Sequence, residues 1–200
     1  ADTAMYEAKN QGKACSVLFD VSMQEEIRQR IRFENNLREA LANKDFELVF
    51  QPIISLGDGV LTSVETLIRW QRPDGQYVSP DSFIPIAEDL GLIVEISEWV
   101  FEHACECYAS WKSEFGTLAP KTISVNMSQK HFASGDLLKT IKAILEKYEM
   151  KAQELQMEIT ETAVMADAQV SMEILSELKK LGTKIALDDF GTGHSTLAML

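Results

Sequence analysis

The spacing of apolar residues divides the chain into a short first part and a longer second part. Residues 1–13 read as the end of a helix, and residues 15–20 as a short strand. From residue 22 onward apolar side chains recur at helical spacing among charged ones. We therefore predict a joining helix over residues 22–43, between a domain end at residues 1–21 and a separate domain at residues 44–200.

The second part opens with two apolar stretches, residues 46–55 and 60–70, separated by a Gly-Asp-Gly turn at residues 57–59. A glycine-containing turn between two such stretches predicts an antiparallel hairpin. A helix is predicted next, with Asp81 as its N-terminal capping residue and Gly91 as the residue that ends or kinks it. A long amphipathic helix follows.

From residue 121 onward, strand and helix patterns alternate. Strands are predicted over residues 121–128, 154–161 and 183–191, and helices over residues 135–150 and 165–182. Such alternation requires right-handed crossovers and produces parallel strands. Buried parallel strands are apolar over most of their length, as the stretches TISV and KIAL are. The predicted fold class is therefore α/β.

Composition supports a folded domain and restricts its ligands. The chain has 200 residues, of which 46% are hydrophobic and 25% charged. It has no run of roughly 18 apolar residues, so no membrane-spanning segment is predicted, and its first residues lack the apolar stretch of a secretory signal. The net charge of −12 argues against binding to DNA or RNA polymers. A bound divalent metal would still let an acidic chain take a small anionic ligand.

The cysteines and the first residue bear on the cellular setting. Cys15, Cys105 and Cys107 cannot all pair, and no neighbouring residues complete a zinc site. Reduced cysteines are typical of a cytoplasmic protein, which is the predicted location. The chain begins without an initiator methionine, so we expect a piece of a longer protein, and a membrane tether upstream is left open.

Polar side chains gather where the predicted parallel strands end. In a (βα) barrel the strand ends face one rim, where active sites are assembled, and an open parallel sheet gathers them at one edge. The residues concerned are Glu65 in the earlier strand and, at strand ends, Asn126, Glu158, Glu161, Asp188 and Asp189.

These side chains form a set of hard oxygen donors. Carboxylate and amide oxygens suit Mg²⁺ or Mn²⁺ and are poor ligands for zinc. Asp188 and Asp189 can both reach the rim, because the chain turns at the last residue of a strand. One of them can bridge two cations about 4 Å apart while the other holds the second cation, as two-metal phosphoryl chemistry requires.

Each residue also has a purely structural interpretation. Glu65 is consistent with a cross-strand ion pair with Arg69 or a lysine, and Asn126 with a turn residue. The segment that begins at Asp188 is consistent with a turn before a helix. Glu161 is better interpreted as a charge at a helix N-terminus, where the helix dipole favours it. Because four acids at strand ends are hard to attribute to chance, we prefer the joint interpretation as a metal site.

Six ordered motifs give the chain a resemblance to a known family. From about Phe46 to its last residue, the chain resembles the EAL family of cyclic-di-GMP phosphodiesterases. The motifs are FELVFQPIISL, ETLIRW, FIPIAEDLGLI, ISVNMS, MEITETAVM and LDDFGTGHSTL. The first segment, ADTAMYEAKNQGK, resembles the last helix of a GGDEF diguanylate cyclase domain, which implies a tandem GGDEF–EAL protein.

The resemblance implies a (βα)8 TIM-like barrel whose first strand is antiparallel to the rest. It also implies Mg²⁺- or Mn²⁺-dependent hydrolysis of cyclic-di-GMP to linear pGpG, or binding alone if the chain is a catalytically inactive receptor. By position, Glu65, Asn126, Glu158 and Asp188 resemble the ligands of one metal. Asp188 would bridge to a second metal, held by Asp189, so that Glu65, Asp188 and Asp189 are the implied catalytic residues.

The resemblance extends to substrate contacts and a loop. Gln51, Leu67 and Arg69 resemble substrate-binding positions, with the arginine on a phosphate. The family's mobile loop couples metal binding to dimerisation, which implies a homodimer. In this chain that loop includes Phe190, Gly191, Thr192 and Gly193.

Three features depart from the family pattern, and one of them is that His194 and Thr196 replace the usual tyrosine and a serine just after the loop glycines. The signature triplet reads Glu-Thr-Leu instead of Glu-Ala-Leu, and Thr66 is expected to point away from the metal because side chains alternate along a strand. The chain also stops at Leu200, after about five of eight barrel strands, whereas the family continues. Residues that follow Leu200 are therefore expected to complete the active site.

Overall fold

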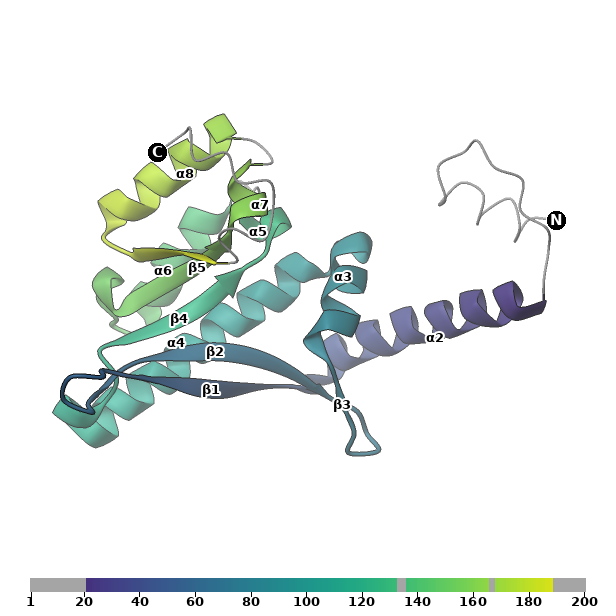
Figure 1. The fold of residues 1–200 in the computed structure, drawn as a ribbon, viewed down its shortest axis with the longest axis horizontal. Coiled ribbons are helices and arrows are strands. Elements are labelled where there is room, and N and C mark those ends of the chain that lie inside the picture. Colours follow the sequence, from purple (N-terminus) through teal and green to yellow (C-terminus); the bar gives the residue numbers. More distant parts are fainter. Residues whose placement is uncertain (1–20, 133–135, 166–167, 189–200) are drawn as a thin grey trace. The chain divides into compact units, whose positions relative to one another are not determined.

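The computed structural model describes residues 21–132, 136–165 and 168–188 (Figure 1). The chain divides into two compact units, residues 1–44 and 45–200. In the first unit, helix α2 (Val21–Asn43) matches the predicted joining helix. The segment that resembles a GGDEF domain lies outside the described residues, so the tandem arrangement stays a prediction.

The second unit is built on a mixed six-stranded sheet with the order β1-β2-β4-β5-β6, in which β3 also pairs with β2. β1 and β3 are antiparallel to β2, whereas β2, β4, β5 and β6 are mutually parallel. This confirms the α/β class and the antiparallel first strand; closure into a barrel stays a prediction. The strands are β1 (Phe46–Ile54), β2 (Leu61–Gln71), β3 (Tyr77–Val78), β4 (Thr122–Met127), β5 (Leu155–Thr160) and β6 (Lys184–Asp188).

The turn between β1 and β2 forms as predicted. Ser55 N–H donates to the carbonyl of Val60 at 2.9 Å, and Gly59 N–H donates to the carbonyl of Ser55 at 2.9 Å. Gly59 has a φ of 69°, in the left-handed region that glycine adopts without steric cost. The Asp58 side chain accepts a hydrogen bond from Val60 N–H, which stabilises the turn further.

Helices connect the parallel strands. Each of α4, α6 and α8 precedes a parallel strand, and α6 packs against both α4 and α8 beside the sheet (Figure 1). The α-helices are α3 (Pro80–Leu90), α4 (Ile93–Phe115), α5 (Gln129–Phe132), α6 (Leu137–Lys147), α7 (Glu161–Met165) and α8 (Ala168–Leu181), and the short 3₁₀ helices are η1 (Gly116–Leu118) and η2 (Ala152–Glu154).

Helix α3 begins earlier than predicted. Its N-cap is Ser79, with φ −62° and ψ 137°, and Pro80 stands at the start of the helix. The assignment of Asp81 as the cap was therefore wrong, because proline at the first helical position already has a helical φ and needs no partner for an N–H. Gly91, with a φ of 73°, ends the helix as predicted.

An aromatic cluster packs the β1–β2 hairpin against α3 and α4. The ring of Phe46 lies 6.2 Å from Trp70, 5.8 Å from Phe83 and 6.0 Å from Trp99, measured between centroids. Trp70 and Phe83 meet edge to face at 5.8 Å. Each such pair contributes about 0.5–1.5 kcal/mol beyond area burial. One face of β2 is therefore packed firmly against α3 and α4, and this packing fixes the position of its opposite face.

Strands β4 and β5 have one apolar face and one polar face. The apolar face is buried and consists of Ile123, Val125, Met127, Leu155, Met157 and Ile159. The alternate positions carry the polar residues Ser124, Asn126, Gln156 and Glu158. The stretch TISV is buried at all four positions, as predicted, whereas KIAL in β6 is half-buried or exposed, so the prediction of a buried strand was wrong there.

Two sequence expectations concern single features. Cys105 and Cys107 are both free thiols, as predicted, whereas Cys15 lies outside the described residues. None of the helices in the described part of the chain combines the length and apolar character needed to cross a membrane.

Candidate metal and nucleotide site at the strand ends

The strand register brings the predicted ligands onto one face of the sheet. Glu65 is the register partner of Ser124, which lies two residues before Asn126 and on the same face. Asn126 is the register partner of Glu158, and Asp188 lies one same-face step beyond Glu158 on the next strand. The four described ligand positions therefore come from four adjacent strands.

Hydrogen bonds connect these side chains. Asn126 Nδ2 donates to Glu65 Oε1 at 3.1 Å and so joins β4 to β2. Arg69 Nη1 donates to the carbonyl of Ile68 at 2.9 Å. Among the residues that the structure describes, neither Glu65 nor Arg69 takes part in a salt bridge, so the ion-pair interpretation of Glu65 is not supported.

Glu158 carries the clearest electrostatic signature. Burial raises the pKa of its carboxyl group, and the negative charges of Glu65 and Asp188 raise the pKa further. The Ser124 hydroxyl and the Gln156 amide act in the opposite direction and lower it. No cationic side chain is among these causes. The ionised form of Glu158 is therefore held at a cost that a bound cation would relieve.

The donors suit a divalent cation, but only part of the predicted set is described. Carboxylates and an amide oxygen are the ligands that Mg²⁺ and Mn²⁺ take, and the raised pKa of Glu158 fits a place for positive charge. Within residues 21–132, 136–165 and 168–188, no three acidic, histidine or cysteine side chains are close enough to enclose one ion. The predicted site also uses Asp189, which lies outside these ranges together with Phe190, Gly191, Thr192 and Gly193.

A cavity of about 540 Å³ adjoins this edge of the sheet. Its lining includes Leu67 and Arg69 from β2, Asn126 from β4 and Asp188 at the end of β6. The structure therefore brings two of the predicted substrate contacts together with two predicted metal ligands. The third predicted contact, Gln51, is the register partner of Glu65 in β1 and does not line the cavity.

Sequence reasoning missed two polar residues beside the site, Ser124 and Gln156. Gln156 Nε2 donates to Glu158 Oε1 at 3.3 Å. Ser124 is fully buried although Asn126, two residues later in β4, is exposed. Each residue precedes a predicted ligand by two positions, and this same-face spacing is the signal that could have identified them.

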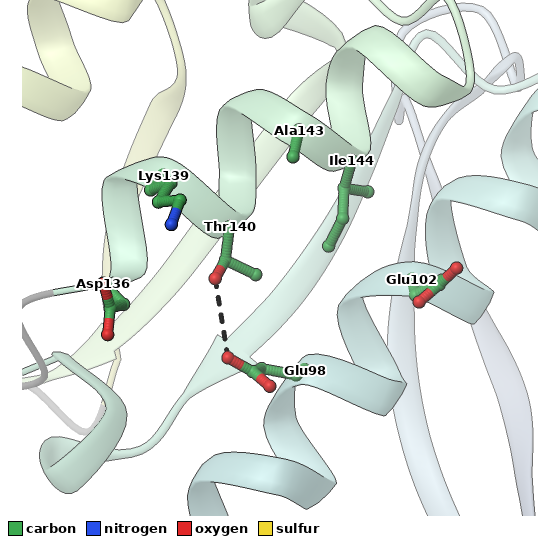
Figure 2. A pocket seen from close by; sticks show the side chains of 7 residues that line it. All are labelled: Glu98, Glu102, Asp136, Lys139, Thr140, Ala143 and Ile144. Atoms are coloured by element: carbon green, nitrogen blue, oxygen red, sulfur yellow. Dashed lines mark hydrogen bonds between the residues drawn. The ribbon is translucent and has the colours of Figure 1, made fainter.

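A second cavity, of about 400 Å³, lies on the helical side between α4 and α6 (Figure 2). Glu98 from α4 faces Thr140 from α6, and Thr140 Oγ1 donates to Glu98 Oε1 at 3.5 Å. Glu102 and Lys139 also line the cavity. Lys147 forms a salt bridge with Glu102. Lysine side chains already stand beside the acids of this surface, and none of the described strand-end residues lines it. It is therefore a weaker candidate site.

The whole of the strand-end region falls within one family match. The family model described as "EAL domain" matches residues 34–200. The chain belongs to the EAL family. A curated relative, "Bifunctional diguanylate cyclase/cyclic di-GMP phosphodiesterase MucR" of Pseudomonas aeruginosa, is 37% identical over the full length of this EAL chain. The chain spans 29% of the length of that relative.

Solved EAL structures share the fold. The structure titled "PaMucR Phosphodiesterase, c-di-GMP complex" is 36% identical with a TM-score of 0.77, over 82% of this chain and 66% of that one. The FimX EAL domain of Xanthomonas citri in complex with c-diGMP is 26% identical with a TM-score of 0.73, over 85% of this chain and 65% of that one. The mixed sheet described above is therefore the TIM-barrel-like EAL fold.

The departure in the EAL signature triplet lies away from the polar face. Thr66 pairs in register with Val125, which belongs to the buried apolar face, and its side chain is 2% exposed. Thr66 therefore lies on the opposite face of β2 from Glu65, as strand alternation predicts, and it also lines the 540 Å³ cavity. The glutamate of the triplet keeps its place on the polar face.

Proposed function

We propose that this EAL domain hydrolyses cyclic-di-GMP to linear pGpG with the help of Mg²⁺ or Mn²⁺. The observation that carries the proposal is the arrival of Glu65, Asn126, Glu158 and Asp188 on one sheet face from four adjacent strands. The adjoining cavity and the raised pKa of Glu158 add support. The printed names of MucR and of the solved PaMucR complex link similar chains to this nucleotide.

The proposed roles follow the chemistry of the donors. Glu65, Asn126, Glu158 and Asp188 would hold one metal ion, and Asp189, together with Asp188, would hold a second. When bound, the metals supply Lewis-acid activation of the phosphate and of the attacking water. Water adds across one phosphodiester bond: its oxygen ends on phosphorus, and the released ribose 3′ oxygen takes a proton.

Substrate placement is proposed for the residues beside the metal ligands. Arg69 lines the cavity, and its guanidinium group suits a phosphate oxygen, for which it would leave the Ile68 carbonyl. Leu67 offers an apolar surface to the nucleotide, and Gln51 a polar group next to Glu65. The loop residues Phe190, Gly191, Thr192 and Gly193, a homodimer and a cytoplasmic location belong to the proposal through the family resemblance.

A second candidate function is a receptor that binds cyclic-di-GMP without turnover. The match to the FimX EAL domain, solved with bound c-diGMP, is compatible with this role. The chain nevertheless has the glutamate of the signature triplet and both neighbouring aspartates, Asp188 and Asp189. An intact acid set favours the hydrolase, because a receptor that only binds has no need of two metals.

The test is an assay of the whole protein with cyclic-di-GMP and Mg²⁺ or Mn²⁺, in which pGpG is followed by chromatography. The hydrolase proposal expects product that disappears when a chelator is added. Tight nucleotide binding without product would move the protein to the receptor class, and neither binding nor product would contradict both functions.

A further inference from the structure

The side of Glu158 that faces away from the strand end has polar neighbours. Gln156 precedes Glu158 by two residues in β5 and therefore lies on the same face. Ser124 is the register partner of Gln156 in β4, just as Asn126 is the register partner of Glu158. Ser124 and Gln156 thus form a cross-strand pair next to the pair of proposed metal ligands Asn126 and Glu158, on the same face and further from the strand ends.

Gln156 of the first pair contacts Glu158 of the second pair directly. Gln156 Nε2 donates to Glu158 Oε1 at 3.3 Å, and the amide is half-buried. The Ser124 side chain is 0% exposed, and its hydroxyl has no hydrogen-bond partner in the described part of the chain. A buried hydroxyl group and an amide donor therefore lie on the same sheet face as this carboxylate, one same-face step away from it.

A neutral donor suits this position better than a cation would. Glu65 and Asp188 lie on the same sheet face as Glu158, and like charges repel, so without support the Glu158 carboxylate gains by turning away from them. A lysine or arginine below Glu158 would hold it but would also neutralise it and compete with a metal. The Gln156 amide occupies Oε1 through one hydrogen bond and leaves the negative charge of the carboxylate in place.

We propose that Gln156, supported by Ser124, is a positioning residue that holds the Glu158 carboxylate ready for a divalent cation. The inference rests on the proposed function, because it takes Glu158 as a metal ligand. It adds a residue that acts on the metal only through Glu158. Hydrogen bonds that orient ligand carboxylates commonly change metal affinity by about 10- to 100-fold when they are removed.

The test compares Gln156→Met with Gln169→Met in the whole protein. Methionine has nearly the length of glutamine but no N–H donor, and Gln169 is an exposed residue of α8 that is not among the proposed ligands or substrate contacts. Free Mn²⁺ is titrated by electron paramagnetic resonance. We expect Q156M to bind Mn²⁺ about 10- to 100-fold more weakly than the wild type, and Q169M to bind like the wild type.

Kinetics supply a readout that a general structural defect would not reproduce. In Q156M the Mn²⁺ concentration needed for half-maximal turnover should rise, while kcat at saturating Mn²⁺ and KM for cyclic-di-GMP stay near the wild-type values. A kcat that stays low at saturating Mn²⁺ would overturn the positioning role. So would a Mn²⁺ dissociation constant within about twofold of the wild type.

A second variant keeps the inference testable if Q156M does not fold. Ser124→Ala removes one oxygen atom from a buried site, and it should weaken Mn²⁺ binding in the same direction but by less. Unchanged Mn²⁺ affinity in S124A would then overturn the inference. A wild-type protein that binds Mn²⁺ without hydrolysis would overturn only the proposed function. A wild-type protein that binds no Mn²⁺ would overturn the metal site and the positioning role together.

Discussion

Two groups of acidic side chains in this EAL domain differ in how their charges are balanced. On the helical side, Glu102 lies beside Lys147, whose hydrogen bond is the main cause that lowers the pKa of Glu102. At the strand ends, burial together with Glu65 and Asp188 raises the pKa of Glu158. One group is neutralised by its own helices, whereas the other keeps unfavourable negative charge in place. The comparison favours the strand ends over the helical side as the place for the proposed cation.

The largest expected effect contrasts Glu65 with Glu102. Glu65→Ala removes a proposed metal ligand and should lower turnover of cyclic-di-GMP by orders of magnitude. Glu102→Ala removes a surface acid that is paired with Lys147 and should leave turnover near the wild-type value. Formation of pGpG in the whole protein measures both. Near-wild-type activity in E65A would contradict the assignment of Glu65 to the metal.

Next in size is the separation of binding from hydrolysis at Asp189. Asp189→Asn should impair the second metal and so reduce hydrolysis strongly, while cyclic-di-GMP binding is retained better. Nucleotide titration by calorimetry and a product assay on the same preparation compare the two. An equal loss in both measurements would argue against the proposed division of roles between Asp188 and Asp189.

A smaller effect concerns stability in the presence of metal. Mn²⁺ at about 100 times its dissociation constant should stabilise the wild type by about 2.7 kcal/mol, which corresponds to a rise in Tm of roughly 5–10 °C. Glu158→Gln should lose most of this rise, and Glu102→Gln should keep it. Thermal melts with chelator and with Mn²⁺ test the prediction, and an unchanged rise in E158Q would remove Glu158 from the ligand set.

The smallest effect is a difference in pH dependence without metal. Because the folded pKa of Glu158 is raised, its contribution favours folding at low pH and is lost as pH rises from the ordinary carboxyl pKa through the raised one. The folded pKa of Glu102 is lowered, so its contribution is present above the ordinary carboxyl pKa and is lost as pH falls. In melts with chelator, E158Q and E102Q should change the slope of Tm against pH in opposite directions. Parallel shifts would contradict the contrast between the two groups.

Several features of the fold were predictable because they depend on local chemistry. The Gly59 turn and the Gly91 helix end follow from backbone conformations that glycine favours, and both were predicted correctly. Helix α7 begins at Glu161, in agreement with its interpretation as a residue at a helix start. The prediction of Asp81 as the N-cap was wrong. Aspartate is a favourable capping residue in general, but Pro80 favours the first helical position, so α3 begins there with Ser79 as its N-cap.

The candidate site was predictable in its ligand types but not in its supporting contacts. Asn126 and Glu158 could be found because polar residues are unusual near the ends of buried strands, and Glu65 because it is an acid within the strand β2. The hydrogen bond from Asn126 to Glu65 depends on which strands are neighbours in the sheet, and the sequence order alone does not contain that information. Gln156 was missed because a single polar residue inside a strand is common unless its same-face neighbour is known to bind something.

The direction of β1 has a consequence for the order in which the domain assembles. The β1–β2 hairpin pairs segments that adjoin in sequence, whereas each later parallel strand must wait for a helical crossover before it can dock. During synthesis Gln51 and Glu65 can therefore meet first, Asn126 and Glu158 join in turn, and Asp188 arrives with the last described strand. A nascent domain that lacks β6 has only part of the proposed ligand set, so its metal affinity should be lower than that of the domain in which β6 has docked.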